Sequence, residues 1–138
     1  MNKTAILISR IALILYLALI VFLCFGHFKH LPDAPKTFLG FEMDKVVHFL
    51  MFFPFPILTW LAVGKQPEGP WKALGMVLLI FLCGSLIAAA TEIGQGFISY
   101  RTTDPNDFKA DSLALALSSL MIFIKMLIMG IRSARNAR

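Results

Sequence analysis

The residues AILISRIALILYLALIVFLCF, from Ala5 to Phe25, form an apolar run that contains one ionised side chain, Arg10. A helix rising about 1.5 Å per residue needs roughly 20 apolar residues to cross about 30 Å of hydrocarbon. The run has this length and lacks the period-two alternation of a β-barrel strand, so it predicts a membrane-spanning helix. It is too long for a typical signal-peptide core, and no small-x-small cleavage site follows it, so we expect a permanent span.

Three more apolar runs of similar length follow along the chain, at about Val46–Gly64, Ala73–Ala90 and Ser112–Ile131. The whole sequence is 58% hydrophobic and 15% charged, with a mean hydropathy of +0.77. A soluble domain carries roughly 25% charged residues, so this composition is typical of a membrane protein. We therefore predict an all-α fold: one polytopic membrane domain over residues 1–138, a bundle of four transmembrane helices at about 5–25, 46–64, 72–95 and 107–131.

Lysine and arginine are distributed unevenly between the two sides that these four spans define. One side carries eight bases and one acid, Glu68, whereas the other carries five bases and seven acids. The base-rich side holds both chain ends and the loop between the second and third runs, so we predict that both termini are cytoplasmic. The net charge is +5, but the bases form no stripe with interleaved aromatics. We therefore expect membrane lipids, and no nucleic acid, as partners.

This topology brings polar residues from three distant segments to the outer end of the bundle. They lie at the start of the second helix, the end of the third and the start of the fourth: Asp44, Lys45, His48, Glu92, Gln95, Arg101, Asp107 and Asp111. Pairs within each helix are spaced i, i+3 or i, i+4, which places them on one face. Pro54 and Pro56 lack an N–H, so we expect the second helix to bend just below His48 and open a cavity. The eight residues therefore predict one polar pocket near the outer membrane surface.

Some of these residues also have a purely structural interpretation. The segment D-P-N-D at 104–107 is a good helix start, with Asp104 as N-cap and proline at the first helical position. Taken alone, Asp107 is then a helix-terminus acid, Asp44 is a cap of the second helix, and His48 is a partnered structural histidine.

Glu92 and Asp111 resist that interpretation. Each lies within one turn of an apolar run, where a charge costs roughly 2.5–3.5 kcal/mol and normally faces the bundle interior with a partner. Arginine can grip a carboxylate with two hydrogen bonds. We therefore expect Arg101 to pair with Glu92 or Asp107, which leaves His48 free to meet a ligand or water.

The combined pattern resembles the VanZ-like membrane proteins. It reads D-K-x-x-H-F at the start of one span, E-x-x-Q at the end of the next, and R-x5-D-x3-D at the opening of another. The matching residues are Asp44, Lys45, His48 and Phe49, then Glu92 and Gln95, then Arg101, Asp107 and Asp111. The resemblance covers roughly residues 44–119. The family commonly has asparagine in place of Asp111 and a Gly-x3-Gly pair in place of Ala114 and Ser118, although small side chains are kept at both positions.

The resemblance implies a multi-pass protein of the bacterial cytoplasmic (inner) membrane with a role in the cell envelope. The family takes its name from a protein that confers low-level resistance to the glycopeptide teicoplanin. It therefore implies an effect on susceptibility to teicoplanin-type antibiotics, with membrane lipids and a lipid-linked cell-wall intermediate or the glycopeptide as partners.

Three functions remain open, and the first is ranked narrowly ahead of the second. In the first, a non-catalytic envelope protein binds a lipid or glycolipid head group in its outward-facing polar pocket. In the second, a small membrane enzyme acts on a lipid-linked substrate. Its His48 would be the general base, Asp44 the orienting group, Glu92 an acid or second base, and Lys45 and Arg101 a clamp for an anion. In the third, the polar residues form a structural cap without a ligand.

Sequence motifs do not decide between these functions. The chain has no Ser-His-Asp spacing, no phosphate-binding glycine-rich loop and no HExxH motif. A site for a hard metal ion among Asp44, His48, Glu92 and Asp107 stays open, but no sequence spacing specifies it, so no metal and no cofactor are predicted.

Overall fold

The computed structural model describes residues 2–27, 37–38, 40–100 and 103–136. Its elements are the helices α1 (Lys3–Phe25), α2 (Met43–Phe52), α3 (Pro54–Val63), α4 (Pro70–Gln95) and α5 (Pro105–Asn136), and the two-residue strands β1 (Thr37–Phe38) and β2 (Phe41–Glu42). Apart from this short ribbon, every element in the described ranges is a helix, which confirms the predicted all-α class.

Among the described residues, four helical segments are long and apolar enough to cross a membrane. They are Lys3–Phe25, Met43–Val63, Pro70–Gln95 and Pro105–Asn136. The last segment continues five residues beyond the predicted end at 131 because the basic tail contains no proline or glycine after Gly130. Large apolar side chains are also exposed on the outside of each segment, for example Ile8, Leu50, Leu79 and Leu120. Apolar residues on the outside as well as the inside are typical of helices that contact lipid.

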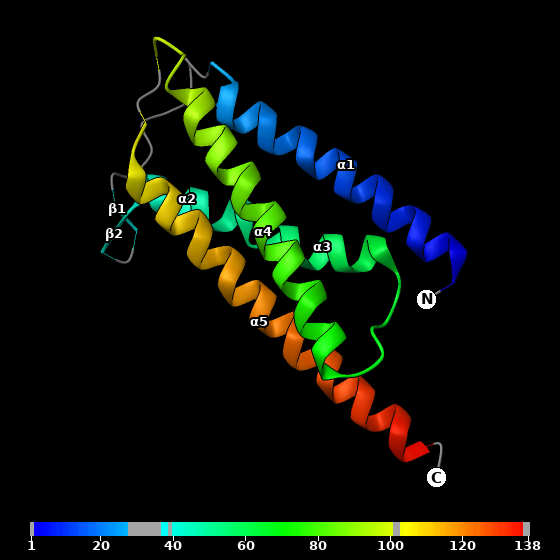
Figure 1. The fold of residues 1–138 in the computed structure, drawn as a ribbon. Coiled ribbons are helices and arrows are strands. Elements are labelled where there is room, and N and C mark those ends of the chain that lie inside the picture. The colour runs from blue at the N-terminus through cyan, green and yellow to red at the C-terminus, as the bar shows by residue number, and fades with distance from the viewer. Residues whose placement is uncertain (1, 28–36, 39, 101–102, 137–138) are drawn as a thin grey trace.

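The four segments lie so that distant parts of the chain meet at one end of the bundle (Figure 1). The end of α1, the start of α2, the end of α4 and the start of α5 gather there, at the upper left of the view. The start of α1, the end of α3, the start of α4 and the end of α5 lie toward the opposite end. Helix α5 packs along both α4 and α2, while α1 packs against α3. We call the first of these ends the polar end.

The second apolar segment is not one continuous helix. It is broken at Phe53, between α2 and α3. Pro54 and Pro56 have no N–H to donate to the carbonyls one turn earlier, which is the reason for the break and the basis on which it was predicted. The hydroxyl of Tyr16 on α1 donates to the carbonyl of Met51. This bond ties α1 to the helix immediately before the break.

Small and polar side chains line the buried face of α5. Asp111, Ala114 and Ser118 are each fully buried, one helical turn apart. Facing them, Gly84 of α4 lies so close to α5 that a Cβ there would be 2.6 Å from Cδ2 of Leu115. The small-residue face predicted from the sequence is therefore the face on which α5 packs against its neighbours.

The β-ribbon was not predicted. Thr37 pairs with Glu42 and Phe38 with Phe41 in antiparallel register, and Gly40 takes a positive φ of 85° in the turn. Such a φ is rarely adopted by residues with a side chain, so glycine suits this turn. The ribbon leads directly into α2 and places Glu42 beside the first turn of that helix.

Candidate functional site

Ionisable side chains from β2, α2, the segment before α5, and α5 itself meet at the polar end. We call this group the acidic cluster, and it consists of Glu42, Asp44, Lys45, His48, Asp104, Asp107 and Asp111. Residues 42–48 and 104–111 are far apart in the sequence and adjacent only because α2 packs on α5. Five of the eight residues predicted to share a pocket belong to this cluster.

Lys45 is held by three carboxylates. Its Nζ lies 2.6 Å from Oδ2 of Asp104, 2.7 Å from Oε2 of Glu42 and 3.4 Å from Oδ1 of Asp107. The ammonium beside Asp104 holds the pKa of that carboxyl below its ordinary value, and the N–H of Asn106, which donates to Oδ1, adds to the effect. Lys45 therefore neutralises the protein's own acids, which is unlike the predicted clamp for an anionic ligand.

His48 lies between two buried aspartates of α5. Its Nδ1 is 3.2 Å and 3.4 Å from the two carboxylate oxygens of Asp111, and its Nε2 is 3.7 Å from Oδ2 of Asp107. A carboxylate accepts and does not donate, so the imidazole hydrogen belongs on Nδ1, where it is shared with Asp111. The expectation that His48 is free is therefore wrong for Nδ1, whereas Nε2 makes no hydrogen bond to any described residue.

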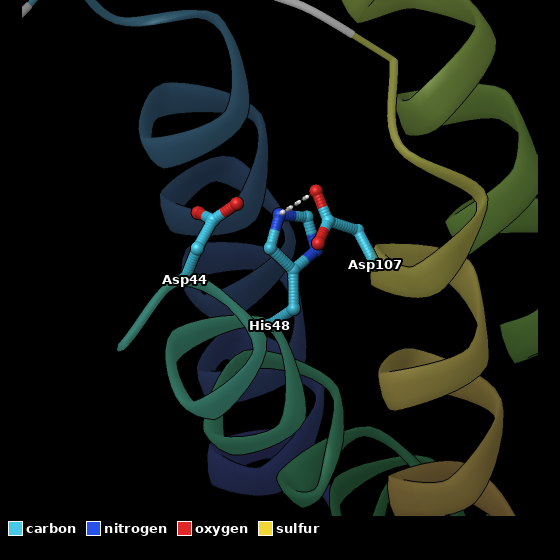
Figure 2. Close-up of side chains that lie close together, drawn as sticks. All are labelled: Asp44, His48 and Asp107. Carbon is cyan, nitrogen blue, oxygen red and sulfur yellow. Dashed lines mark ion pairs between the residues drawn. The ribbon is translucent and has the colours of Figure 1, made fainter. Parts of the chain in front are cut away.

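Asp44 approaches the same histidine from within α2. It lies one turn before His48, and Figure 2 shows the imidazole between the carboxylates of Asp44 and Asp107. One donor atom from each of these three residues lies within 4.8 Å of the other two. Asp44 is exposed, whereas His48 and Asp107 are buried. The three side chains thus form a small group of ligand-type atoms with one side open to solvent.

Glu92 and Gln95 take different directions from the end of α4. Oε1 of Glu92 accepts a 2.6 Å hydrogen bond from the backbone N–H of Asp104, which links it to the edge of the acidic cluster. The amide of Gln95 instead donates to the carbonyl of Cys24 on α1, 3.2 Å away. Gln95 therefore joins two helices, and no described contact places it among the acids.

The predicted pairing of Arg101 with Glu92 or Asp107 concerns a residue that lies outside the described ones. Both acids have other partners among the described residues: the Asp104 N–H for Glu92, and Lys45 with His48 for Asp107.

The sequence interpretation missed two members of the cluster. Glu42 was counted only for topology, although its i, i+3 spacing from Lys45 is a recognisable ion-pair signal on a helix start. Asp104 was interpreted only as an N-cap. It has that role, since Pro105 begins α5 and Oδ1 of Asp104 accepts from the N–H of Asn106 at 2.9 Å. Its second oxygen, Oδ2, contacts Lys45, so this side chain both caps α5 and pairs with the lysine.

The cluster carries an excess of acid. Its five carboxylates face one lysine and one histidine. Such an excess attracts cations and hydrogen-bond donors and repels anions. Hydroxyl, ammonium or metal ligands therefore fit this site better than a bare phosphate.

An apolar groove begins beside the cluster, between α2 and α5. It has a volume of about 310 Å³ and is lined by Phe41, Lys45, Val46, Phe49, Leu50, Ala110 and Leu113. Lys45 is the one charged residue in this lining, and it is also the lysine that pairs with Glu42, Asp104 and Asp107. The groove and the acidic cluster are therefore contiguous.

Comparisons with known proteins give little guidance. No family model matches the chain. A curated protein with some similarity is the mitochondrial 15S rRNA processing factor ppr3 of Schizosaccharomyces pombe, which is 29% identical over 106 residues. The alignment covers 69% of this chain, but the chain spans only 15% of the length of that protein. No solved structure matches. The resemblance to the VanZ-like family therefore stays a prediction.

Proposed function

We propose that this chain is an integral membrane protein of the bacterial cell envelope that binds a lipid or glycolipid at its polar end. The acyl chain would lie in the groove between α2 and α5, and the head group would reach the acidic cluster. The observation that carries the proposal is the position of Lys45, which belongs to both the apolar groove and the ion-paired cluster. A molecule with an apolar chain and a polar head matches a surface that is apolar in the groove and charged in the adjoining cluster.

The orientation in the membrane follows from the charges. Both termini and the segment between α3 and α4 would face the cytoplasm of the bacterial inner membrane, because Lys and Arg concentrate there. The polar end would then face the outer leaflet, where a lipid-linked cell-wall intermediate is accessible.

The acid excess indicates what kind of head group fits. Carboxylates accept hydrogen bonds, so sugar hydroxyls or an ammonium group would be bound in preference to an exposed phosphate. This preference is consistent with a glycolipid. In the role that the VanZ-like resemblance implies, sequestering such a lipid would change the access of a teicoplanin-type glycopeptide to its target.

The test is native mass spectrometry of the protein released from detergent, with its co-purified lipids. Ala110→Trp places a large ring in the groove, so we expect the bound lipid to be lost. Ala116→Trp is the matched control, because Ala116 is an exposed alanine of the same helix and does not line the groove. Equal lipid occupancy in the two variants and the wild type would refute lipid binding in the groove and favour a structural cap.

A second candidate function, catalysis on the bound lipid, is favoured by the contact of His48 Nδ1 with Asp111. A histidine oriented by a carboxylate is the usual arrangement of a general base. The orienting residue would be Asp111, not Asp44 as the sequence suggested. The same spectra decide this point, because an enzyme would carry a lipid product of altered mass that His48→Gln does not produce.

A further inference from the structure

We infer that Asp44, His48 and Asp107 bind one divalent ion of the first transition row, and that Asp111 orients the imidazole for it. This inference rests on the side-chain geometry of the acidic cluster and does not depend on lipid binding. It goes beyond the sequence, in which no spacing specified a metal site.

The distances between the donor atoms suit a shared ion. Nε2 of His48 and Oδ2 of Asp107 are 3.7 Å apart, which is too long for a hydrogen bond. Two ligands that each lie about 2.1 Å from a tetrahedral ion are about 3.4 Å apart, close to that separation. The donor atoms of all three residues lie within 4.8 Å of one another. Asp44, the exposed member, completes the set from the solvent side.

Asp111 supplies the supporting contact that metal-bound histidines usually have. Such a histidine donates its second ring N–H to a carboxylate, a carbonyl or water, which sets the tautomer and the orientation of the ring. Here Nδ1 contacts both oxygens of Asp111, whose side chain is 1% exposed. With the hydrogen on Nδ1, Nε2 carries the lone pair, and this nitrogen lies 3.7 Å from Oδ2 of Asp107 (Figure 2).

Asp107 supplies a second and independent observation. It is 4% exposed, and its Oδ1 is buried without a hydrogen-bond partner in the part of the chain that the structure describes. Among the described residues, the cation nearest to that oxygen is Lys45, at 3.4 Å. Lys45 is held more closely by Asp104 and Glu42, at 2.6 and 2.7 Å. A buried carboxylate that is incompletely paired destabilises the fold. A bound dication would offset that loss of stability.

The ligand types narrow the choice of ion. Imidazole suits Zn²⁺, Fe²⁺ and their neighbours, while carboxylate also suits Mn²⁺. Mg²⁺ and Ca²⁺ prefer a set made of oxygen ligands alone. We therefore expect Zn²⁺ or Mn²⁺. Three protein ligands leave at least one coordination position for water on the exposed side, next to Asp44.

The experiment is isothermal titration of tag-free, chelator-stripped protein with Zn²⁺ and with Mn²⁺, and with Mg²⁺ for comparison. We expect one ion per chain, with Zn²⁺ or Mn²⁺ binding at least tenfold more tightly than Mg²⁺. The decisive variant is Asp44→Asn, because this residue is exposed and its replacement leaves the buried contacts intact. Its dissociation constant should rise at least tenfold. Asp111→Asn should weaken binding about 10–100-fold, as loss of a supporting contact typically does.

Glu42→Gln is the control, since Glu42 pairs with Lys45 and has no part in the proposed ligand set. It should bind the ion as the wild type does. Absence of binding to the wild type would overturn the inference. So would equal affinity of Asp44→Asn and the wild type, or an equal loss in Glu42→Gln and Asp44→Asn, which would indicate diffuse attraction to the acidic surface.

Discussion

Replacing His48 with alanine should destabilise the protein severely. The imidazole is the one described partner of the Asp111 carboxylate, whose side chain is 1% exposed, and it also faces Asp107. Removing the partner of a buried carboxylate costs about 3–5 kcal/mol because the carboxylate is left without compensation. The sequence-based expectation that His48 is free to meet a ligand or water does not predict this loss.

Lys45→Met provides the comparison. The Lys45 side chain is 23% exposed, and its two closest partners, Asp104 and Glu42, are 32% and 68% exposed. Ion pairs that water reaches contribute about 0–1 kcal/mol each. The loss for Lys45→Met should therefore be smaller than that for His48→Ala.

The assay is the free energy of unfolding in detergent micelles, measured with a chelator present so that no bound metal contributes. The double variant His48→Leu/Asp111→Leu should lose less than the sum of the two single losses, because it removes the buried carboxylate together with its partner and fills the space with apolar groups. The reasoning fails if His48→Ala is no less stable than Lys45→Met. It also fails if the losses of the two single variants simply add in the double variant.

Three further outcomes are expected. Gly84→Ala should destabilise the fold by about 1–3 kcal/mol, because its Cβ would lie 2.6 Å from the Leu115 side chain on α5. Gly75→Ala on the same helix is the control: its Cβ meets nothing within 4 Å, so the variant should be neutral or slightly stabilising. Thermal unfolding of the two variants compares them. The pKa of Asp104 is lowered by Lys45, so their pair should stabilise the fold fully above the ordinary value of 3.8 and lose its effect as the pH falls through the lower folded value. The stability difference between wild type and Asp104→Asn should accordingly vanish in acid, and an acid titration of both proteins in detergent measures it. A reporter fused after Arg138 should be active only in the cytoplasm, and activity outside it would contradict the proposed orientation.

Much of the architecture could be predicted because it depends on local rules. Each apolar run is long enough to satisfy its own backbone hydrogen bonds as a helix, so the four helical segments follow from length and composition. The break at Phe53 follows from the missing N–H of Pro54, and the start of α5 follows from Asp104 and Pro105. Because consecutive spans run antiparallel, residues 42–48 and 104–111 are expected at the same end of the bundle, and this expectation needs no information on side-chain contacts.

The partners of individual side chains could not be predicted in this way. Glu92 and Gln95 are three residues apart and nominally share a face of α4, yet one bonds to the Asp104 backbone and the other to Cys24 on α1. Residues spaced i, i+3 differ by about 60° around a helix, which is enough to direct them to different neighbours when helices pack on two sides. The rotation of each helix about its axis therefore decides such pairings.

The sequence by itself determined four apolar helical segments, the interruption of the second, and the gathering of polar residues at one end. Only the tertiary structure decided that Asp111 holds Nδ1 of His48, that Lys45 is occupied by the protein's own acids, and that Nε2 faces Asp107. The physical reason is that the two kinds of interaction act over different separations in the sequence. Helix formation depends on neighbours within a few residues, whereas the contacts of a buried charge depend on how α2 and α5, about 60 positions apart in the chain, turn their faces toward each other.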